Sequence, residues 1–505
     1  MTHAQPGAKP SPWAPLLALL ISLLLPVPAP AMEIELPVHR TVLDNGLTLL
    51  VVPRHQAPVF SAVIMVRAGA LDEPAGATGV AHLMEHMAFK GTRTIGTTDY
   101  RAERQLLEQI DDRMGEFLVL SDAGADPARL EALETEIDRL RKAAKALVVQ
   151  DEFGKLYGRH GSVGLNAGTS SDYTAYFVSL PANRLPLWAA VEAERMATPV
   201  FREFYSERDV VLEERRMRVD SSPGGRLNEQ FFATAFTASP YRNPTIGWES
   251  DVARLTRGQA YDFFHDHYTP GNTVIALVGD LDPLEAERQV RATFGRIPAR
   301  DAVSVHATRE PEPQGPRRVT VLDEAGPALT LGFLKPSVGH PDDAVLDVID
   351  TILSGGSSSR LRRALVLEQR VAVGVATRNG GPGGRLNNLF LMSATPAAPD
   401  LLEKTEAALF SELERLRTEP VTELELARAR TLVEASQVRS HESNSGLAQG
   451  LAWAECIAGS WRYLFDIQEE INRVSADDVL RVARRYLTPE RAVIAELKAP
   501  VEDTK

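Results

Sequence analysis

The sequence predicts an α+β protein made of two homologous halves, each a largely antiparallel sheet with helices packed on it. The segment "HDHYTPGNTVIALVGDL" (265–281) resembles "ARRYLTPERAVIAELKA" (483–499), so Pro270 and Pro489 mark corresponding points between a helix and a β-branched strand. Strand patterns open both copies and helical patterns follow them, an order typical of α+β layers. The 505 residues also exceed what one hydrophobic core normally holds.

Residues 1–31 predict a secretory signal peptide that is removed after Ala31. They hold Lys9, an apolar run over 16–25 and then "PVPAPA", which ends in a small-x-small cleavage site. The apolar run is too short for a bilayer, which takes about 20 residues. The alternative is an uncleaved membrane anchor. We expect an exported protein of the periplasm, as in Gram-negative bacteria, with attachment to a membrane left open.

Composition argues against two kinds of binding site. The chain carries a formal net charge of −13, and loss of Lys9 with the signal peptide would leave an even more acidic chain, whereas nucleic-acid binding needs a basic surface. Cys456 is the only cysteine, which excludes an intramolecular disulfide and a cysteine-rich zinc site. Its apolar surroundings predict a buried, unreactive thiol.

The predicted domain boundaries follow the repeat. The first half spans 32–299 and opens with strand patterns such as "TVLDNGLTLLVVPR". The polar, proline-rich residues 300–317 predict a linker. The second half, 318–505, also opens with strands, and helical patterns follow over 340–353 and 400–417.

A charged helical stretch interrupts the first half at about 101–160. Over 101–147, charged residues alternate with Leu and Ala at helical spacing, and "SDAGADPA" breaks the pattern with Gly and Pro. We interpret this insertion as an amphipathic helical hairpin on the surface. A short coiled-coil arm is the alternative.

The stretch "GVAHLMEHMAFKGT" (79–92) places polar groups on a helix that is otherwise suited to burial. His82 and His86 are four residues apart, so their rings share one face and form half of a Zn²⁺ site. Glu85 is placed to reach a water molecule at the metal and to take its proton. His-x-x-Glu-His is the inverted zincin motif, but two core histidines bonded to backbone carbonyls are an equal alternative at this point.

A catalytic zinc ion needs a third protein ligand and an open position. The best source of that ligand is "FYSERDVVLEERRMRVD" (204–220), where Glu207 and Glu214 are seven residues apart and therefore share a helix face. Between them, Val210 and Val211 are expected to face the core. The weaker candidates are Glu192, Glu194 and Glu213.

With these motifs in this order, the sequence resembles the M16 (pitrilysin-like) metallopeptidases, which include mitochondrial processing peptidase and insulin-degrading enzyme. The resemblance covers about residues 38–497 and runs through "LDNGLTLLVV", "GVAHLMEHMAFKGT", "LNAGTSSDYTAYFVSLP", "SERDVVLEE", "YTPGNTVIALVGDL" and "LSGGSSSRL". It is strongest to the zinc-carrying subunits of bacterial and mitochondrial processing peptidases. The resemblance implies one zinc ion per chain, bound by His82, His86 and Glu214. It also implies that Glu85 is the general base and that Glu207 orients a ligand.

The resemblance also indicates where a peptide would bind. Family members add the substrate as an extended strand beside the zinc helix, which implies that "LNAGTSSDYTAYF" (165–177) is an edge strand. Backbone groups near Asn166 and Ala167 would then hold the peptide, and the Asn166 amide can donate as well. A turn that enters a strand is the alternative. The spacing from His86 to Glu214 is longer than is usual in the family, and the helical insertion accounts for most of the excess.

The second half differs from active members of the family. "RNGGPGG" (378–384) lacks the Lys-Ser/Thr of a phosphate loop and is predicted to be a flexible loop between strands. The stretch "DAVLDVIDTIL", at the place of the zinc helix, has no histidine. Where active members carry an Arg and, seven residues later, a Tyr, this chain has Val366 and Val373, with Arg362 or Arg370 as possible substitutes. The resemblance therefore implies a heterodimer with a homologous chain that lacks the zinc motif and supplies that pair.

Together these features predict an exported zinc endopeptidase that cleaves peptides or unfolded segments in a closed chamber. One alternative is a non-catalytic member of the same fold that acts as a scaffold or peptide-binding subunit. The other is a zinc hydrolase that acts on small molecules.

Overall fold

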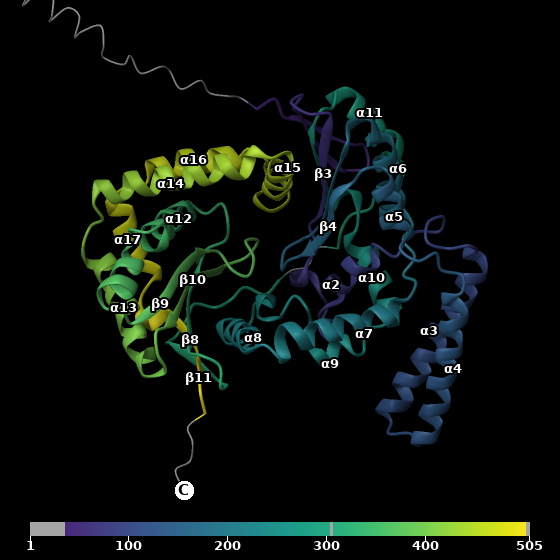
Figure 1. Ribbon diagram of the computed structural model, residues 1–505, viewed down its shortest axis with the longest axis horizontal. Coiled ribbons are helices and arrows are strands. Elements are labelled where there is room, and N and C mark those ends of the chain that lie inside the picture. Colours follow the sequence, from purple (N-terminus) through teal and green to yellow (C-terminus); the bar gives the residue numbers. More distant parts are fainter. Residues whose placement is uncertain (1–35, 304–306, 501–505) are drawn as a thin grey trace, which may run out of the picture. The chain divides into compact units, whose positions relative to one another are not determined.

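The computed structural model describes residues 36–303 and 307–500 (Figure 1). The predicted signal peptide and residues 304–306 of the predicted linker lie outside the described residues. Each half of the chain contributes one sheet, and helices pack on both sheets. The fold class predicted from the sequence is therefore confirmed.

The first sheet has its strands in the order β1-β2-β6-β3-β5-β4. The strands are β1 (His39–Val42), β2 (Thr48–Pro53), β3 (Val59–Val66), β4 (Val163–Thr169), β5 (Thr174–Pro181) and β6 (Thr273–Gly279). β2 and β6 run parallel, and the other neighbours are antiparallel. β4 is an edge strand, so one side of its backbone is free to pair with another chain.

The second sheet repeats this plan in the order β7-β11-β8-β10-β9. The strands are β7 (Arg317–Leu322), β8 (Ala328–Lys335), β9 (Ala372–Asn379), β10 (Asn388–Pro396) and β11 (Ala492–Lys498). β7 and β11 form the one parallel pair of this sheet, as β2 and β6 do in the first, and β9 is the edge strand that corresponds to β4. Pro270 and Pro489 each begin a short 3₁₀ turn before β6 and β11, so the sequence repeat and the structural repeat coincide.

The helices follow the same division. Those of the first half are α2 (Val80–Met87), α3 (Tyr100–Asp122), α4 (Pro127–Lys145), α5 (Glu152–Arg159), α6 (Leu185–Ala197), α7 (Phe204–Arg215), α8 (Pro223–Ala235), α9 (Glu249–Val252), α10 (Arg257–His267) and α11 (Pro283–Thr293). Those of the second are α12 (Pro341–Ser354), α13 (Leu402–Thr418), α14 (Glu423–Glu442), α15 (Asn444–Trp453), α16 (Tyr463–Arg473) and α17 (Ala476–Tyr486). No helix in the described part of the chain is long and apolar enough to cross a membrane. The predicted boundary at 300–317 stays a prediction, although β7 already begins at Arg317.

The predicted insertion forms the packed helix pair α3–α4, which Figure 1 shows extending away from the first sheet, and α5 follows it. Residues 123–126 separate α3 from α4, within the predicted break. Leu107 and Ile110 are buried on the inner face of α3. A buried ion pair, with Arg202 Nε 2.8 Å from Glu103 Oε1, ties α3 to the segment that leads into α7.

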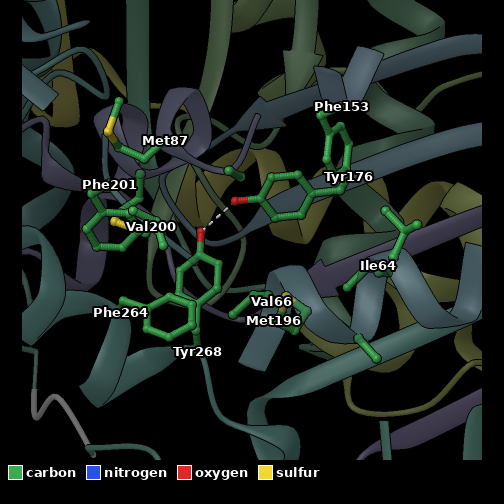
Figure 2. Packing of buried hydrophobic residues seen from close by; sticks show 14 of the residues in the cluster. Ile64, Val66, Met87, Phe153, Tyr176, Met196, Val200, Phe201, Phe264 and Tyr268 are labelled. Carbon is green, nitrogen blue, oxygen red and sulfur yellow. Dashed lines mark hydrogen bonds between the residues drawn. The ribbon is translucent and has the colours of Figure 1, made fainter. Parts of the chain in front are cut away.

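The core under the first sheet holds α2 in place. Val80, Leu83 and Met87 of α2 pack there against residues of β3 and β5. At its centre the hydroxyl groups of Tyr176 and Tyr268 form a hydrogen bond of 2.9 Å among buried apolar side chains (Figure 2). Because the apolar side of α2 is fixed in this way, its polar residues are directed to the other side.

Each half also contributes a helix to the sheet of the other half. α15 packs against β3 and β6, and α8 packs against β7 and β11. Strand β3 is therefore buried on both faces, so that Val63 and Met65 are as inaccessible as Ile64, which faces the core between them. On the second sheet, Phe231 of α8 shares a buried cluster with Val493 of β11.

Candidate metal centre

The start of α2 is built to orient the metal-binding motif. Gly79 precedes the helix with φ +88°, and a Cβ at this position would lie 2.8 Å from the carbonyl oxygen of Ile246, so only glycine fits without strain. The Glu73 carboxylate accepts hydrogen bonds of 2.9 Å from the backbone N–H groups of Gly79 and Ala81. These bonds satisfy free donors of the first helical turn and fix the direction of the helix.

The structure brings together the three residues expected to bind zinc. Glu214 Oε2 lies 3.8 Å from His82 Nε2 and 3.5 Å from His86 Nε2, and the two rings are 4.9 Å apart between centroids. Ligand atoms of the three side chains lie within 4.8 Å of one another. Among the described residues, this is the one group of three or more His, Cys, Asp or Glu side chains with that property.

The chemistry of this group fits a zinc ion. Two imidazole nitrogens and one carboxylate oxygen are a donor set used by catalytic zinc, which leaves a further position open. Burial, followed by the charges of His86 and Arg218, lowers the pKa of His82 to about 3, so its ring is neutral and able to donate a lone pair at pH 7. His82 Nδ1 is buried without a hydrogen-bond partner, so the polarity of this ring is not satisfied by the protein alone.

Glu207 supports His86 from behind. Its Oε2 lies 3.4 Å from His86 Nδ1, and its other oxygen forms an ion pair with Lys90. Burial disfavours the charged form of His86, but the hydrogen bond to Glu207 and the nearby carboxylates outweigh it and raise the pKa of His86. For Glu207 burial likewise acts against the charge, and the bonds to His86 and Lys90 lower its pKa overall. Glu207 thus contacts the ring nitrogen of His86 that faces away from Glu214.

Glu85 lies beside the three ligands and is held by the edge strand. Its Oε2 accepts a hydrogen bond of 2.7 Å from the hydroxyl group of Thr169, the last residue of β4. Burial raises the pKa of Glu85, and hydrogen bonds from Thr169 offset part of that effect. One carboxylate oxygen of Glu85 is thereby oriented, as a general base requires.

The helix that carries Glu214 differs from expectation at one residue. Val211 is buried, as predicted, but Val210 is 49% exposed, so the prediction for Val210 is wrong. Adjacent residues on a helix point about 100° apart, so Val211 can face the core while Val210 faces solvent. Glu213 is exposed and pairs with Arg216 at 2.7 Å, which removes it from the site.

The other rival carboxylates are used elsewhere. Glu192 is buried in a pair with Arg195, and Glu194 accepts hydrogen bonds from Thr92 and Thr94. Among the described residues, neither belongs to the metal-binding group.

Sequence reasoning missed three residues that touch the centre. Lys90 and Arg218 are each four residues beyond a candidate metal-binding residue, and that spacing could have revealed them, although Lys90 follows the end of α2 and Arg218 lies in the π-helical turn after α7. Arg218 Nη1 lies 2.6 Å from Glu214 Oε1, which leaves Oε2 directed at the histidines. Thr169 is two residues after Ala167 in the strand, hence on the same face.

The expected substrate strand is shorter than predicted. Residues 165–177 are not one edge strand, because β4 ends at Thr169, a turn occupies 170–173, and β5 begins at Thr174. The edge position of β4 and its contact with α2 agree with the expectation. Asn166 is exposed and pairs with Phe177 of β5, and the half-buried Ala167 lies next to it.

The second half places no donor at the expected positions. Val366 is half-buried in a π-helical turn over Arg362–Glu368, and Val373 is 64% exposed on the edge strand β9. Arg370 is exposed as well. Cys456 is buried, and this burial raises its pKa to about 12, in agreement with an unreactive thiol.

Two family models match the chain. The model for "Insulinase (Peptidase family M16)" matches residues 49–111, and the model for "Peptidase M16 inactive domain" matches residues 254–433. The chain belongs to the M16 peptidase family. The first match contains the His-x-x-Glu-His motif of this M16 chain, and the second covers much of the half whose described residues form no metal-binding group.

Several relatives of this M16 chain are named as zinc proteases. Zinc protease PqqE of Helicobacter pylori is 28% identical over 92% of this chain and 93% of that protein. A probable mitochondrial-processing peptidase subunit beta of Arabidopsis thaliana is 24% identical over 92% of this chain and 78% of that protein. Among solved structures, a protease from Helicobacter pylori has a TM-score of 0.76 at 26% identity and covers 92% of this chain and 100% of that chain. The first half of the periplasmic protease PqqL from Escherichia coli shares the fold, with a TM-score of 0.66 at 18% identity over 92% of both chains.

Proposed function

We propose that this chain is an exported, zinc-dependent endopeptidase that cleaves peptides or unfolded segments inside a closed chamber. The observation that carries the proposal is the convergence of His82, His86 and Glu214, with Glu85 held beside them by a strand edge. The M16 family and the names of the relatives agree with a peptidase. Export rests on the sequence of residues 1–31, and N-terminal sequencing of the secreted protein would test cleavage after Ala31.

The residues of the chain divide the work of hydrolysis. A bound Zn²⁺ would polarise the peptide carbonyl and make water a better nucleophile near pH 7. His82, His86 and Glu214 would hold the ion, and Glu207 would fix the ring of His86 through Nδ1. Glu85 would take a proton from the attacking water and then give it to the leaving amine.

The substrate would bind as an added strand. β4 has a free edge next to α2, so an extended peptide can pair with its backbone and pass the metal centre. The exposed Asn166 is available to donate to such a peptide. This mode of binding favours extended or unfolded segments, because a folded protein has few free strands to pair.

The experiment is a comparison of metal content and hydrolysis in matched variants. Glu85→Gln should keep one zinc ion per chain and lose hydrolysis of an unstructured peptide, because an amide cannot take the proton. His82→Ala should lose both metal and activity. Peptidase activity retained in Glu85→Gln would refute the role of Glu85.

We also propose that the active form is a heterodimer with a homologous chain that lacks the zinc motif. The side chains of Val366 and Val373 cannot donate hydrogen bonds, so another chain would supply the groups that polarise the substrate across the chamber. Peptide cleavage by the zinc-loaded chain should rise strongly when a homologous chain with the missing Arg and Tyr is added. Full activity of the isolated chain, unchanged by that addition, would contradict this proposal.

The same assay addresses the non-catalytic alternative. A zinc-loaded chain that binds peptides but does not cleave them, alone or with the partner, would favour a scaffold or peptide-binding subunit.

A further inference from the structure

Two corresponding turns of the two halves contact each other. The turn 170–173 joins β4 to β5 in the first half, and the loop 380–387, which contains most of the "RNGGPGG" motif, joins β9 to β10 in the second. The strands on either side occupy equivalent places in the two sheets. The glycine-rich loop therefore reaches the turn that follows the proposed substrate strand.

Asp172 is the centre of this contact. It is 3% exposed, and its Oδ1 accepts a hydrogen bond of 2.6 Å from the hydroxyl group of Tyr241. Its Oδ2 accepts from the backbone N–H groups of Gly384 and Arg385. A buried carboxylate that accepts three hydrogen bonds is stabilised in one position.

Arg385 adds a second attachment. Its guanidinium group donates to both carboxylate oxygens of Asp72, at 2.7 and 3.1 Å, and to the carbonyl oxygen of Asp172 at 3.2 Å. The segment before Asp72 binds the other side of the turn, because Leu71 N donates to Ser171 O at 2.8 Å. The turn is thus held between the first half and the loop of the second.

The close approach explains one glycine of the motif, Gly383. A Cβ on Gly383 would lie 2.6 Å from both carboxylate oxygens of Asp172 and from the hydroxyl oxygen of Tyr241. Any side chain at this position would push the loop and Asp172 apart. The prediction of a simply flexible loop therefore misses its role as an anchored contact.

The turn 170–173 begins directly after Thr169, the residue that donates a hydrogen bond to Glu85. Thr169, which donates to Glu85, is the last residue of β4 and is followed directly by Ser170. We propose that the loop 380–387 of the second half positions Glu85, by fixing Asp172 and, through the turn, the hydroxyl group of Thr169. The inference rests on the proposed peptidase function for its catalytic consequence, and its residues are positioning residues.

The hydrogen bond from Thr169 to Glu85 is tested by substitution of Thr169. Thr169→Val removes a hydrogen bond to a charged group and should lower kcat by about 10- to 100-fold, with KM changed less than about threefold. Thr169→Ser keeps a hydroxyl group and should restore most of kcat. Zinc content should be the same in all of these proteins, because Thr169 is not a metal ligand.

The effect of the loop 380–387 on Thr169 and Glu85 is tested by a double-mutant cycle. Gly383→Ala should lower kcat by at least about tenfold, because displacements of about 1 Å at a distance can cost that much or more. Combined with Thr169→Val, it should add little further loss, since both act through one contact. The control is Gly326→Ala, where a Cβ meets no atom within 4 Å and which should resemble wild type. Multiplied losses in the double variant, or an unchanged kcat in Gly383→Ala, would overturn the proposal.

Hydrogen exchange tests this inference independently of the proposed function, because it does not require peptidase activity. Hydrogen exchange of the segment 163–175 should be faster in Gly383→Ala than in wild type and unchanged in Gly326→Ala. If Gly383→Ala does not fold, Tyr241→Phe, which removes one hydrogen bond to Asp172, serves instead. Unchanged exchange in the folded variant would refute the proposal that the loop 380–387 fixes the turn 170–173, even if the wild-type protein proved to have no peptidase activity.

Discussion

Replacing Glu207 by Gln tests how much the contact of Glu207 with His86, a proposed zinc ligand, contributes to zinc binding. The substitution keeps the size of the side chain but removes the charge that faces His86 Nδ1 at 3.4 Å and pairs with Lys90. Loss of such a group typically costs 10- to 100-fold in metal affinity or activity. A separation of 3.4 Å is long for a charge-assisted hydrogen bond, so we expect the lower end, about tenfold or about 1.4 kcal/mol.

The assay is a competition for zinc against a coloured chelator at equilibrium. Glu207→Gln should raise the Kd for zinc about tenfold without abolishing binding. Glu213→Gln is the matched control, because Glu213 lies on the same helix but is exposed and bonded to Arg216. A Kd within twofold of wild type for Glu207→Gln, or an equal loss for Glu213→Gln, would refute the assignment of the supporting residue.

Two further predictions concern stability. Burial and the charge of Asp343 raise the pKa of Asp347 to about 7, so its ionisation costs stability as pH rises from about 4 to 7. Asp347→Asn should thus match wild type at pH 4 and exceed it at pH 8, by about 1 to 2 kcal/mol in urea unfolding, because Asp347 is only partly buried and solvent screens part of the effect. No gain at pH 8 would disprove this. Val211→Ala should lower the free energy of unfolding by about 2 kcal/mol, because Val211 is buried, and the exposed Val210→Ala should lower it by less than about 0.5 kcal/mol. Equal losses in the two variants would contradict this difference in burial.

Part of the candidate metal centre could be predicted from the sequence, because its residues lie on helices with regular spacing. His82 and His86 share a face at i and i+4, and Glu207 and Glu214 share one at i and i+7, so periodicity alone brings each pair together. That the two pairs meet could be inferred only from the family resemblance, because more than a hundred residues separate them. The repeat around Pro270 likewise survives in sequence, since the same turn is needed before the last strand of each sheet.

Two predictions from the sequence, the strand over 165–177 and the burial of Val210, are wrong. The stretch 165–177 was expected to be one strand, yet Ser170, Ser171 and Asp172 are turn-forming residues that interrupt it. Val210 and Val211 are both expected to face the core, but they point about 100° apart and only Val211 is buried. The turn could be predicted from the sequence itself, whereas the exposure of Val210 could not, because two adjacent helical residues can both be buried.

The contact between Asp172 and the loop of the second half could not be predicted. It joins residues more than two hundred positions apart, and its donors are backbone N–H groups, which have no signature in sequence. The glycines of the loop were visible, but a glycine reveals only that space or an unusual conformation is required, and the neighbour that requires it must be seen.

The packing between the halves shows why the half without a metal-binding group among its described residues is needed for the site. Without α15, the faces of β3 and β6 that carry Val63 and Met65 would be exposed, and without α8 the same would hold for β7 and β11. Apolar faces of this kind are not stable in water unless another element covers them. The sequence of β6, "TVIALVG", is continuously apolar after Thr273 rather than alternating, which is the pattern of a strand covered on both faces. The first half therefore depends on the second for the sheet on which α2 and the metal-binding residues rest.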